Sequence, residues 1–414
     1  MARAGRDRGA PGGRGRRGRR GGGSAYVAHW RTQAASIRAS LAALGVGLLA
    51  TLVAGAVLAA AADRVADVPG LLALIPAAIG MRGSTFGAFG SRLATGILTG
   101  EYRAGGPRRG WLGRQVRAVS LLSVVSSVQA GLLAWIVAAA VGLPTAGPLA
   151  LVAVSLVGGV TASAVLLTVV LGLARRASRR GWSLDDVAAP VVSATGDLVT
   201  LPALLGASLL LGAGTVAADV VGGVGLAAGA VLVVLGVRDR DERMRRLLRE
   251  SLVVLSLAVS VDVLAGVAIE ARLEQQFTSA ALLVMLPPFV AKCGALGGML
   301  ASRLSSQLHV GTLEPSPWPS LRARLDLSLT VLFAVVTFAG VGASVWAVTT
   351  VVPGVAALPL TTSLSVALLA GALAVPILST VAYAAATVSF RHGFDPDNHG
   401  IPIVTATMDL AGVL

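Results

Sequence analysis

The chain has 414 residues, of which 55% are hydrophobic and 13% charged, and its formal net charge at pH 7 is +14. A soluble globular protein of this length does not carry so much apolar surface, so most of the chain must face lipid or other helices. A single cysteine, Cys293, excludes an intrachain disulfide and any metal site that needs several cysteines.

Apolar runs long enough to cross a bilayer recur along the chain. Because a bilayer core needs about 20 apolar residues per helix, we predict an all-α polytopic membrane protein with about eleven transmembrane helices. The helices are expected over residues 40–62, 71–98, 118–143, 148–174, 187–212, 216–237, 251–269, 280–304, 327–351, 361–388 and 401–414. The last run is too short to cross unaided, so it is either truncated or a half-helix that enters a cavity.

Basic residues alternate from side to side between the predicted spans. The N-terminal tail and every second loop after it hold 28 Lys and Arg residues, whereas the opposite loops hold only Arg64 and Arg272. Cytoplasmic loops are rich in basic residues and exported loops are not. The pattern predicts a multi-pass protein of the cell membrane with a cytoplasmic N-terminus.

The segment Met1–Gly23 is rich in Arg and Gly and has no apolar run beside it, which does not fit a signal peptide. We predict that residues 1–39 are a disordered cytoplasmic tail that binds anionic lipids. An RNA-binding arm is the weaker alternative, and no nucleic-acid partner is expected because the other basic residues lie between apolar spans.

Two motifs occur twice at an almost constant spacing. The first reads LIPAAIGMRG from Leu74 and MLPPFVAKCG from Met285, and its Pro, Gly, Ser, Arg and Leu residues recur at an offset of 211. The second reads TGDL from Thr195 and TMDL from Thr407, and each copy follows an aspartate, Asp185 or Asp397, at the same offset of 212. Chance is a poor explanation for two such pairs, so we predict an internal repeat.

The repeat defines the expected domain organisation. Residues 40–212 and 249–414 form two five-helix units, and residues 213–248 form a linking helix with a basic loop. Because five is an odd number of crossings, the extra helix restores the first orientation. We therefore predict two parallel repeats related by a pseudo-twofold axis along the membrane normal.

Asp197 and Asp409 are the residues on which the functional hypothesis depends. Asp197 lies eleven residues beyond Asp186 on a helix, which places it about 16 Å deep, and Asp409 lies at the matching depth. An ionised carboxylate near the midplane is costly, so it should face a wet cavity or a bound cation. Two such carboxylates across a twofold axis match the charge of a divalent cation.

The neighbouring side chains favour a hard cation. Ser193 and Thr405 lie one turn before each Asp on the same face and complete the predicted metal site. No thiolate or histidine cluster lies near, which disfavours zinc, whereas Mg²⁺ asks for one or two carboxylates and keeps several waters. We expect Mg²⁺ as a transported ion, with no organic cofactor and no enzymatic activity.

Several alternatives stay open. Each Asp could be neutral, or paired with Arg82 or Lys292, and serve only folding. The same acids could carry protons in a proton- or sodium-coupled transporter of another solute, or the chain could be a scaffold without transport. Asp219 and Asp262 have no matching acid at the repeat offset, so we interpret them as structural or capping residues. The four histidines are interpreted as loop residues without a shared site.

At these motifs the chain resembles the MgtE and solute carrier family 41 magnesium transporters. The resemblance rests on the P-A-x-x-G-x-x-G run that ends in SRLAT at residues 91–95, on the DPDN tetrad at 395–398, and on TGDLVT at 195–200. It extends from about Ser40 to the C-terminus. It implies a divalent-cation path between the two repeats, with Asp197 and Asp409 at positions where the family binds magnesium.

The resemblance also implies which other residues line the path or its gate. They are Gly80, Gly83, Ser84, Ser91, Arg92, Gly294, Ala295, Ser302, Arg303, Asp185, Asp186, Asp397 and Asn398. From their position alone, the two arginines could instead extend to the membrane surface. Ser84 and Ala295 stand where the family usually has Asn, which puts a side-chain contact from Ala295 in doubt. The expected partners are the lipid bilayer and a divalent cation, with Na⁺ as a candidate coupling ion.

Overall fold

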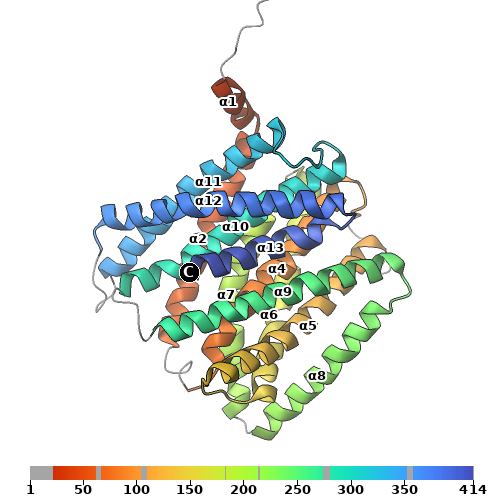
Figure 1. The fold of residues 1–414 in the computed structure, drawn as a ribbon, viewed down its shortest axis with the longest axis vertical. Helices are drawn as coiled ribbons and strands as arrows, with labels where there is room; N and C mark the ends of the chain where they lie inside the picture. The colour runs from red at the N-terminus through yellow and green to blue at the C-terminus, as the bar shows by residue number, and fades with distance from the viewer. Residues whose placement is uncertain are drawn as a thin grey trace, which may run out of the picture.

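The computed structural model describes residues 22–61, 67–103, 110–181, 183–212, 215–273, 280–351 and 358–413, and within these ranges it contains helices and no strand. Figure 1 shows their arrangement. The helices are α1 (Gly22–Thr32), α2 (Ala34–Ala60), α4 (Leu71–Leu98), α5 (Trp111–Val141), α6 (Pro148–Arg180), α7 (Ala188–Gly212), α8 (Thr215–Val237), α9 (Glu242–Leu273), α10 (Ala280–Val310), α11 (Leu321–Val351), α12 (Leu360–Arg391) and α13 (Pro396–Val413).

Every predicted span falls on one of these helices. Eight of them, α2, α5, α6, α7, α8, α9, α11 and α12, are long and apolar enough to cross a membrane. The other three, α4, α10 and α13, carry most of the motif residues and are shorter or less apolar over their described residues. The all-helical polytopic class is therefore confirmed, while a transmembrane course for α4, α10 and α13 stays a prediction.

The N-terminal region differs from the expectation of a disordered tail over residues 1–39. Helix α1 covers Gly22–Thr32, and α2 already begins at Ala34. The physical reason is a distant contact: the Trp30 indole nitrogen donates a hydrogen bond to Ser328 Oγ of α11 at 3.1 Å. Composition cannot reveal such an anchor. Residues 1–21 of the predicted tail lie outside the described residues.

Helices α4, α7, α10 and α13 form the centre of the molecule (Figure 1). Helices α4 and α10 pack against each other, and each also packs against both α7 and α13. Helices α5, α6 and α8 lie on one side of this centre, and α11 and α12 lie on the other. The motif-bearing helices are thus enclosed by the more apolar ones, as expected for segments that carry polar side chains through a membrane.

Helices α2 and α9 each pack against helices that lie far from them in the sequence. Helix α2 packs against α10 and α11, which follow it by more than 200 residues, and α9 packs against α4 and α5. Helix α2 also contacts α7, and α9 contacts α13 in the same way. This exchange interlocks the earlier and later parts of the chain around the central helices.

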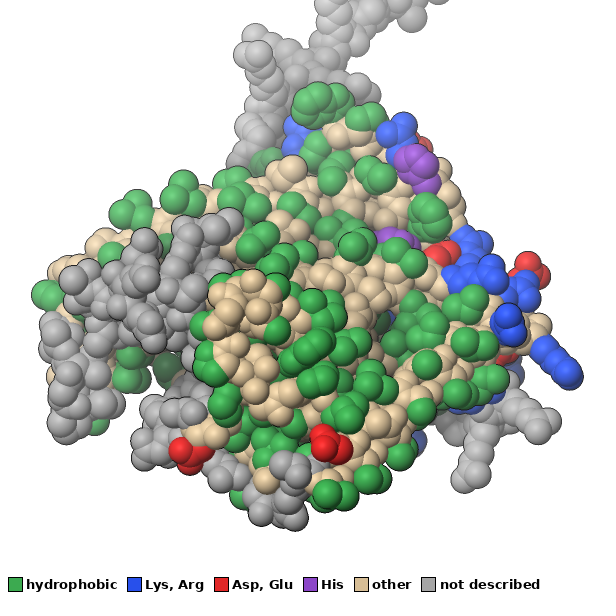
Figure 2. Space-filling view, turned by 60° about the horizontal axis from the view of Figure 1, so that its bottom comes forward, with side chains coloured by type: hydrophobic (Ala, Val, Ile, Leu, Met, Phe, Trp, Pro, Cys, Tyr) green, Lys and Arg blue, Asp and Glu red, His purple; other side chains and the backbone are tan. Residues whose placement is uncertain are grey.

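The outer surface is apolar. Large hydrophobic side chains such as Leu49, Leu209 and Leu373 are 63–74% exposed. Figure 2 shows hydrophobic side chains across much of one face, whereas Lys and Arg side chains gather along its right-hand edge. An exposed apolar surface of this extent needs lipid around it. It supports a multi-pass membrane protein.

Glycine allows some of the closest helix contacts. A methyl group on Gly131 of α5 would lie 2.7 Å from the carbonyl oxygen of Leu151 on α6. A methyl group on Gly342 of α11 would lie 2.7 Å from the carbonyl oxygen of Ser363 on α12. The two helix pairs therefore touch backbone to backbone, which is how small residues hold membrane helices together.

Candidate ion-binding site

Two groups of polar side chains lie between the central helices. We call the first the central cluster, and it consists of Thr51, Ser84, Asp197, Asp262, Lys292, Thr405 and Asp409. We call the second the terminal cluster, and it consists of Ser91, Arg92, Asp185, Asp186, Ser302, Arg303, Asp397 and Asn398. Ser84 and Ser91 are seven residues apart on α4, so about 10 Å along the helix axis separates the two clusters.

On one side of the central cluster, Asp197 of α7 has two partners. Its side chain is 5% exposed, and the Thr51 hydroxyl of α2 donates a hydrogen bond to Oδ2 at 2.7 Å. Lys292 of α10 is fully buried and close enough for its charge to interact with that of Asp197. Among the described residues, the Lys292 ammonium has no hydrogen-bond partner. Asp197 is therefore balanced by a hydroxyl and a cation.

On the other side, Asp409 of α13 has a second acid as its neighbour. Asp262 of α9 is 1% exposed, and no group in the described parts of the chain donates a hydrogen bond to either of its oxygens. A methyl group on Gly80 of α4 would lie 2.7 Å from Asp262 Cγ and 3.0 Å from Asp409 Oδ2. The two carboxyl groups thus meet beside Gly80, within reach of each other.

The structure brings most of the predicted metal ligands together. Asp197 and Asp409 lie close enough for their charges to interact. The Thr405 hydroxyl lies 2.8 Å from Ser84 Oγ, which joins α13 to α4. Ser193 is half-buried on α7.

Of the two basic residues considered as partners, Lys292 lies close enough to Asp197 for their charges to interact. Arg82 instead lies toward α5 and α6, where a methyl group on Gly159 would be 3.0 Å from Nη2, and no acid pairs with it in the described ranges. The alternative in which Arg82 pairs with Asp197 or Asp409 is therefore wrong. Arg82 faces away from both acids.

The predicted path residues around this cluster differ in the space they leave. A methyl group on Gly83 would meet no atom within 4 Å, whereas one on Gly294 would lie 3.5 Å from Thr405 Cγ2. Ala295 is buried and has no hydroxyl with which to repeat the contact that Ser84 makes. Open space therefore exists beside α4.

In the terminal cluster, two serines meet where α4 and α10 come together. The Ser91 hydroxyl donates to Asp397 Oδ1 at 2.7 Å, and the Ser302 hydroxyl donates to Asp185 Oδ1 at 2.6 Å. The two serine oxygens are 2.9 Å apart. These residues recur at offsets of 211 and 212, so each serine contacts the acid of the other motif copy.

The two arginines hold the flanks of this cluster. Arg92 donates to Gln115 Oε1 at 2.8 Å and to Asn398 Oδ1 at 2.9 Å. Arg303 forms an ion pair with Asp186. Both arginines are buried, so the alternative that they extend to the membrane surface is wrong. Their guanidinium groups find partners inside the protein, which offsets the cost of burying them.

Burial perturbs two acids that lie outside the helices at this end. It raises the pKa of Asp185 to about 7. Burial and the neighbouring Asp397 carboxylate raise the pKa of Asp395 to about 6. Both causes disfavour the charged form of an acid. The terminal cluster therefore changes its charge near neutral pH.

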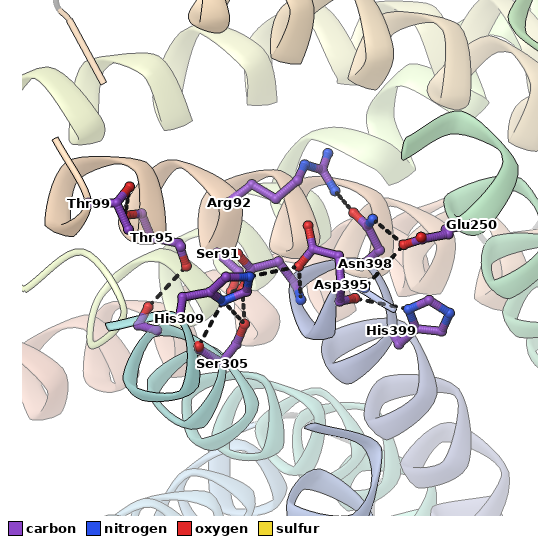
Figure 3. Close-up of polar contacts among 12 residues, drawn as sticks. Ser91, Arg92, Thr95, Thr99, Glu250, Ser305, His309, Asp395, Asn398 and His399 are labelled. Carbon is purple, nitrogen blue, oxygen red and sulfur yellow. Dashed lines mark hydrogen bonds and ion pairs between the residues drawn. The ribbon is translucent and has the colours of Figure 1, made fainter. Parts of the chain in front are cut away.

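Figure 3 shows His309, Asp395 and Asn398 converging from α10 and the start of α13. His309 Nε2 lies 3.5 Å from Asp395 Oδ1, and ligand atoms of His309, Asp395 and Asp397 all lie within 4.8 Å of one another, which is close enough to hold a metal ion. The interpretation of His309 as a loop residue without a shared site is wrong, because it lies in the last turn of α10.

Sequence reasoning missed the place of Asp262 in the central cluster. Asp262 lies in the interior of α9, so the interpretation as a helix cap is wrong. The position 211 residues earlier is Thr51, which contacts Asp197 as Asp262 neighbours Asp409. The repeat offset therefore contained the signal. A search for a matching acid could not find it, because the matching residue is a threonine.

An all-helical membrane protein that buries several carboxylates between its helices belongs, by fold and site, to the class of ion-transporting membrane proteins. The chain belongs to the MgtE family of divalent cation transporters, whose family model matches residues 75–207 and 286–414, more than half of its length. One relative is Solute carrier family 41 member 3 of Rattus norvegicus, 26% identical over 377 residues that cover 84% of this chain and 78% of the relative. No solved structure matches the chain.

Proposed function

We propose that the chain moves Mg²⁺ across the membrane along a path between two repeats, and that the ion binds in the central cluster. The observation that carries this proposal is the convergence of Asp197 and Asp409 from α7 and α13. Membership of a divalent cation transporter family supports the cargo. Carboxylate and hydroxyl oxygens with open space beside them suit an ion that keeps part of its water shell.

We infer that residues 40–212 and 249–414 are the two repeats, related by a pseudo-twofold axis. Reciprocal contacts support this: α4 packs against α13 and α10 against α7, and α2 contacts α7 as α9 contacts α13. The two segments that match the family begin at residues 75 and 286, which are 211 positions apart. The path then follows the axis between α4 and α10.

The terminal cluster serves as the gate of this path. Ser91 Oγ and Ser302 Oγ are 2.9 Å apart, and Thr95 Oγ1 and Ser306 Oγ, one turn further, are 3.3 Å apart. A hydrated divalent cation cannot pass between oxygens that are in hydrogen-bonding contact with each other. This conformation is therefore closed at the terminal cluster, and transport requires α4 and α10 to separate there.

Uptake into proteoliposomes tests the proposal. The full chain is reconstituted around a Mg²⁺-sensitive dye, and the double variant Asp197→Asn with Asp409→Asn is expected to lose uptake. Asp219→Asn is the matched control, because Asp219 is exposed on α8, away from both clusters. Unchanged uptake by the double variant would overturn the proposal. A parallel run with and without a Na⁺ gradient reports whether flux is coupled to sodium.

One observation favours a second candidate, a proton-coupled transporter of another solute. Two acids beside each other, such as the buried Asp262 and the half-buried Asp409, readily share one proton. In that case solute flux follows an imposed pH gradient and divalent cations have no effect. Mg²⁺ uptake that persists without a pH gradient excludes this candidate.

A further inference from the structure

The two halves of the central cluster are built differently. Positions related by the repeat offset carry residues of different charge and size, and the structure places Thr51 and Lys292 near Asp197 but Asp262 and Gly80 near Asp409. The pairs that differ are Thr51 and Asp262, Gly80 and Ala291, Met81 and Lys292, Ser84 and Ala295, and Ser193 and Thr405.

The half around Asp197 is already satisfied. Thr51 donates to its carboxylate at 2.7 Å, and the buried Lys292 ammonium supplies a positive charge. Ala291 and Ala295 stand where the other half has a glycine and a serine, so this half has a methyl group at both positions and no hydroxyl at the second. A second cation here would meet an acid whose charge is already balanced.

Among the residues that the structure describes, the half around Asp409 has no cation that balances its acids. Asp262 is buried, accepts no hydrogen bond in the described parts of the chain, and lies beside Asp409. Gly80 has no side chain, so both acids can lie against α4 at this point, and the Ser84 and Thr405 hydroxyls meet 2.8 Å apart. Two carboxylates so close together cannot both be ionised without a bound cation.

We propose that the transported divalent cation is held in this second half, by Asp262 together with Asp409, and that Lys292 is a tethered counter-ion for Asp197. The inference rests on the function proposed above and assigns the ligands within that site. Three carboxylates and one ammonium give the cluster a net charge of −2, which the ion neutralises. The positive charge of Lys292 in one half cancels the negative charge of Asp262 in the other. The net charge of the cluster therefore matches that of a divalent ion.

Binding of Mg²⁺ to the purified full chain tests the assignment. Thermal unfolding in detergent is measured while MgCl₂ is titrated against NaCl of equal ionic strength, since a ligand of the native state raises the melting temperature. Asp262→Asn is expected to weaken Mg²⁺ binding by about tenfold or more, as Asp409→Asn does. The double variant Asp197→Asn with Lys292→Met keeps the cluster charge and is expected to weaken Mg²⁺ binding less than Asp262→Asn does.

A variant that fails to fold cannot bind Mg²⁺ more tightly, so a variant with an expected gain of binding separates the assignment from misfolding. Lys292→Met introduces the residue found at position 81, removes one positive charge and is expected to tighten Mg²⁺ binding by about tenfold. A further variant exchanges the halves, with Thr51→Asp, Met81→Lys, Asp262→Thr and Lys292→Met. In this exchanged chain binding is expected to depend on Asp197 more than on Asp409.

Two results would overturn the assignment while leaving the transport proposal intact. One is native-like Mg²⁺ binding by Asp262→Asn. The other is weaker binding by Lys292→Met, which would make Lys292 a positioning residue and not a competing charge. If either result is obtained and the double variant Asp197→Asn with Asp409→Asn also loses Mg²⁺ flux, the ion uses the two symmetric acids, Asp197 and Asp409, alone. Retained flux in that chain would instead sink the transport proposal itself.

Discussion

Replacing Arg303 with glutamine should destabilise the protein strongly. Its guanidinium group is buried, pairs with Asp186, lies 3.6 Å from Asp326 Oδ1 and donates to Ser36 Oγ at 3.1 Å. The replacement leaves two buried carboxylates, 2% and 4% exposed, without a cation. Removal of one partner from a buried ion pair costs about 3–5 kcal/mol, because the remaining charge stays uncompensated.

A double-mutant cycle separates the ion pair from simple loss of packing. Asp186→Asn removes the carboxylate that Arg303 neutralises, so the combined variant Arg303→Gln with Asp186→Asn should lose less stability than the two single losses together. The coupling free energy is expected to be about 2–3 kcal/mol. Stability is followed by circular dichroism at the helical band during thermal unfolding in detergent. Additive losses within about 0.5 kcal/mol would refute the reasoning.

Three further predictions use the same preparation. Gly131→Val should lower the free energy of unfolding by about 1–3 kcal/mol, because its side chain meets the backbone carbonyl of Leu151, whereas Gly172→Ala should have little effect because its methyl group meets no atom within 4 Å. Burial raises the pKa of Asp185 in the folded state to about 7, above its unfolded value. The free energy of unfolding should therefore fall as pH rises through 7, by about 1.4 kcal/mol between about pH 6 and pH 8. Asp185→Asn should abolish this part of the pH dependence. Gly80→Ala should reduce Mg²⁺ uptake about tenfold or more, because its methyl group would displace the Asp262 carboxylate and crowd Asp409, with normal folding by size-exclusion chromatography.

Each of these predictions has a clear contrary result. Equal stability of Gly131→Val and Gly172→Ala would mean that α5 and α6 can separate without loss. An unchanged pH profile in Asp185→Asn would assign the loss of stability to another group. Native uptake by Gly80→Ala would place the ion elsewhere than beside Gly80.

The positions of the helices could be predicted well, because a long apolar run in a chain of this composition has few explanations other than a transmembrane helix. Helix α4 has the bounds that the apolar run predicts. Helix α9 begins at Glu242, nine residues before the predicted span, because its first turns are charged and lie outside the apolar run. Hydropathy reports the part of a helix that meets lipid, so helical ends that carry charged residues are invisible to it.

The candidate site was predictable only where the repeat carried the same residue twice. Ser91 and Ser302, and Asp185 and Asp397, were found in this way, and the structure brings all four together. Arg303 pairs with Asp186, but the contact between His309 and Asp395 joins residues that no periodicity relates. Such contacts depend on how helices that are distant in the sequence pack against each other. Local sequence patterns do not determine this packing.

A single chain with two related halves can hold a site that two identical subunits cannot. In a symmetric dimer every substitution appears twice, so one lysine beside Asp197 would become two, and its compensating aspartate would also double. Here Lys292 and Asp262 occur once each, on opposite sides of the central cluster, and their charges cancel. The cluster therefore keeps the net charge of two carboxylates while only one half is left free to bind a cation. If Mg²⁺ affinity follows Asp262 and not Asp197, this asymmetry determines where the ion is bound.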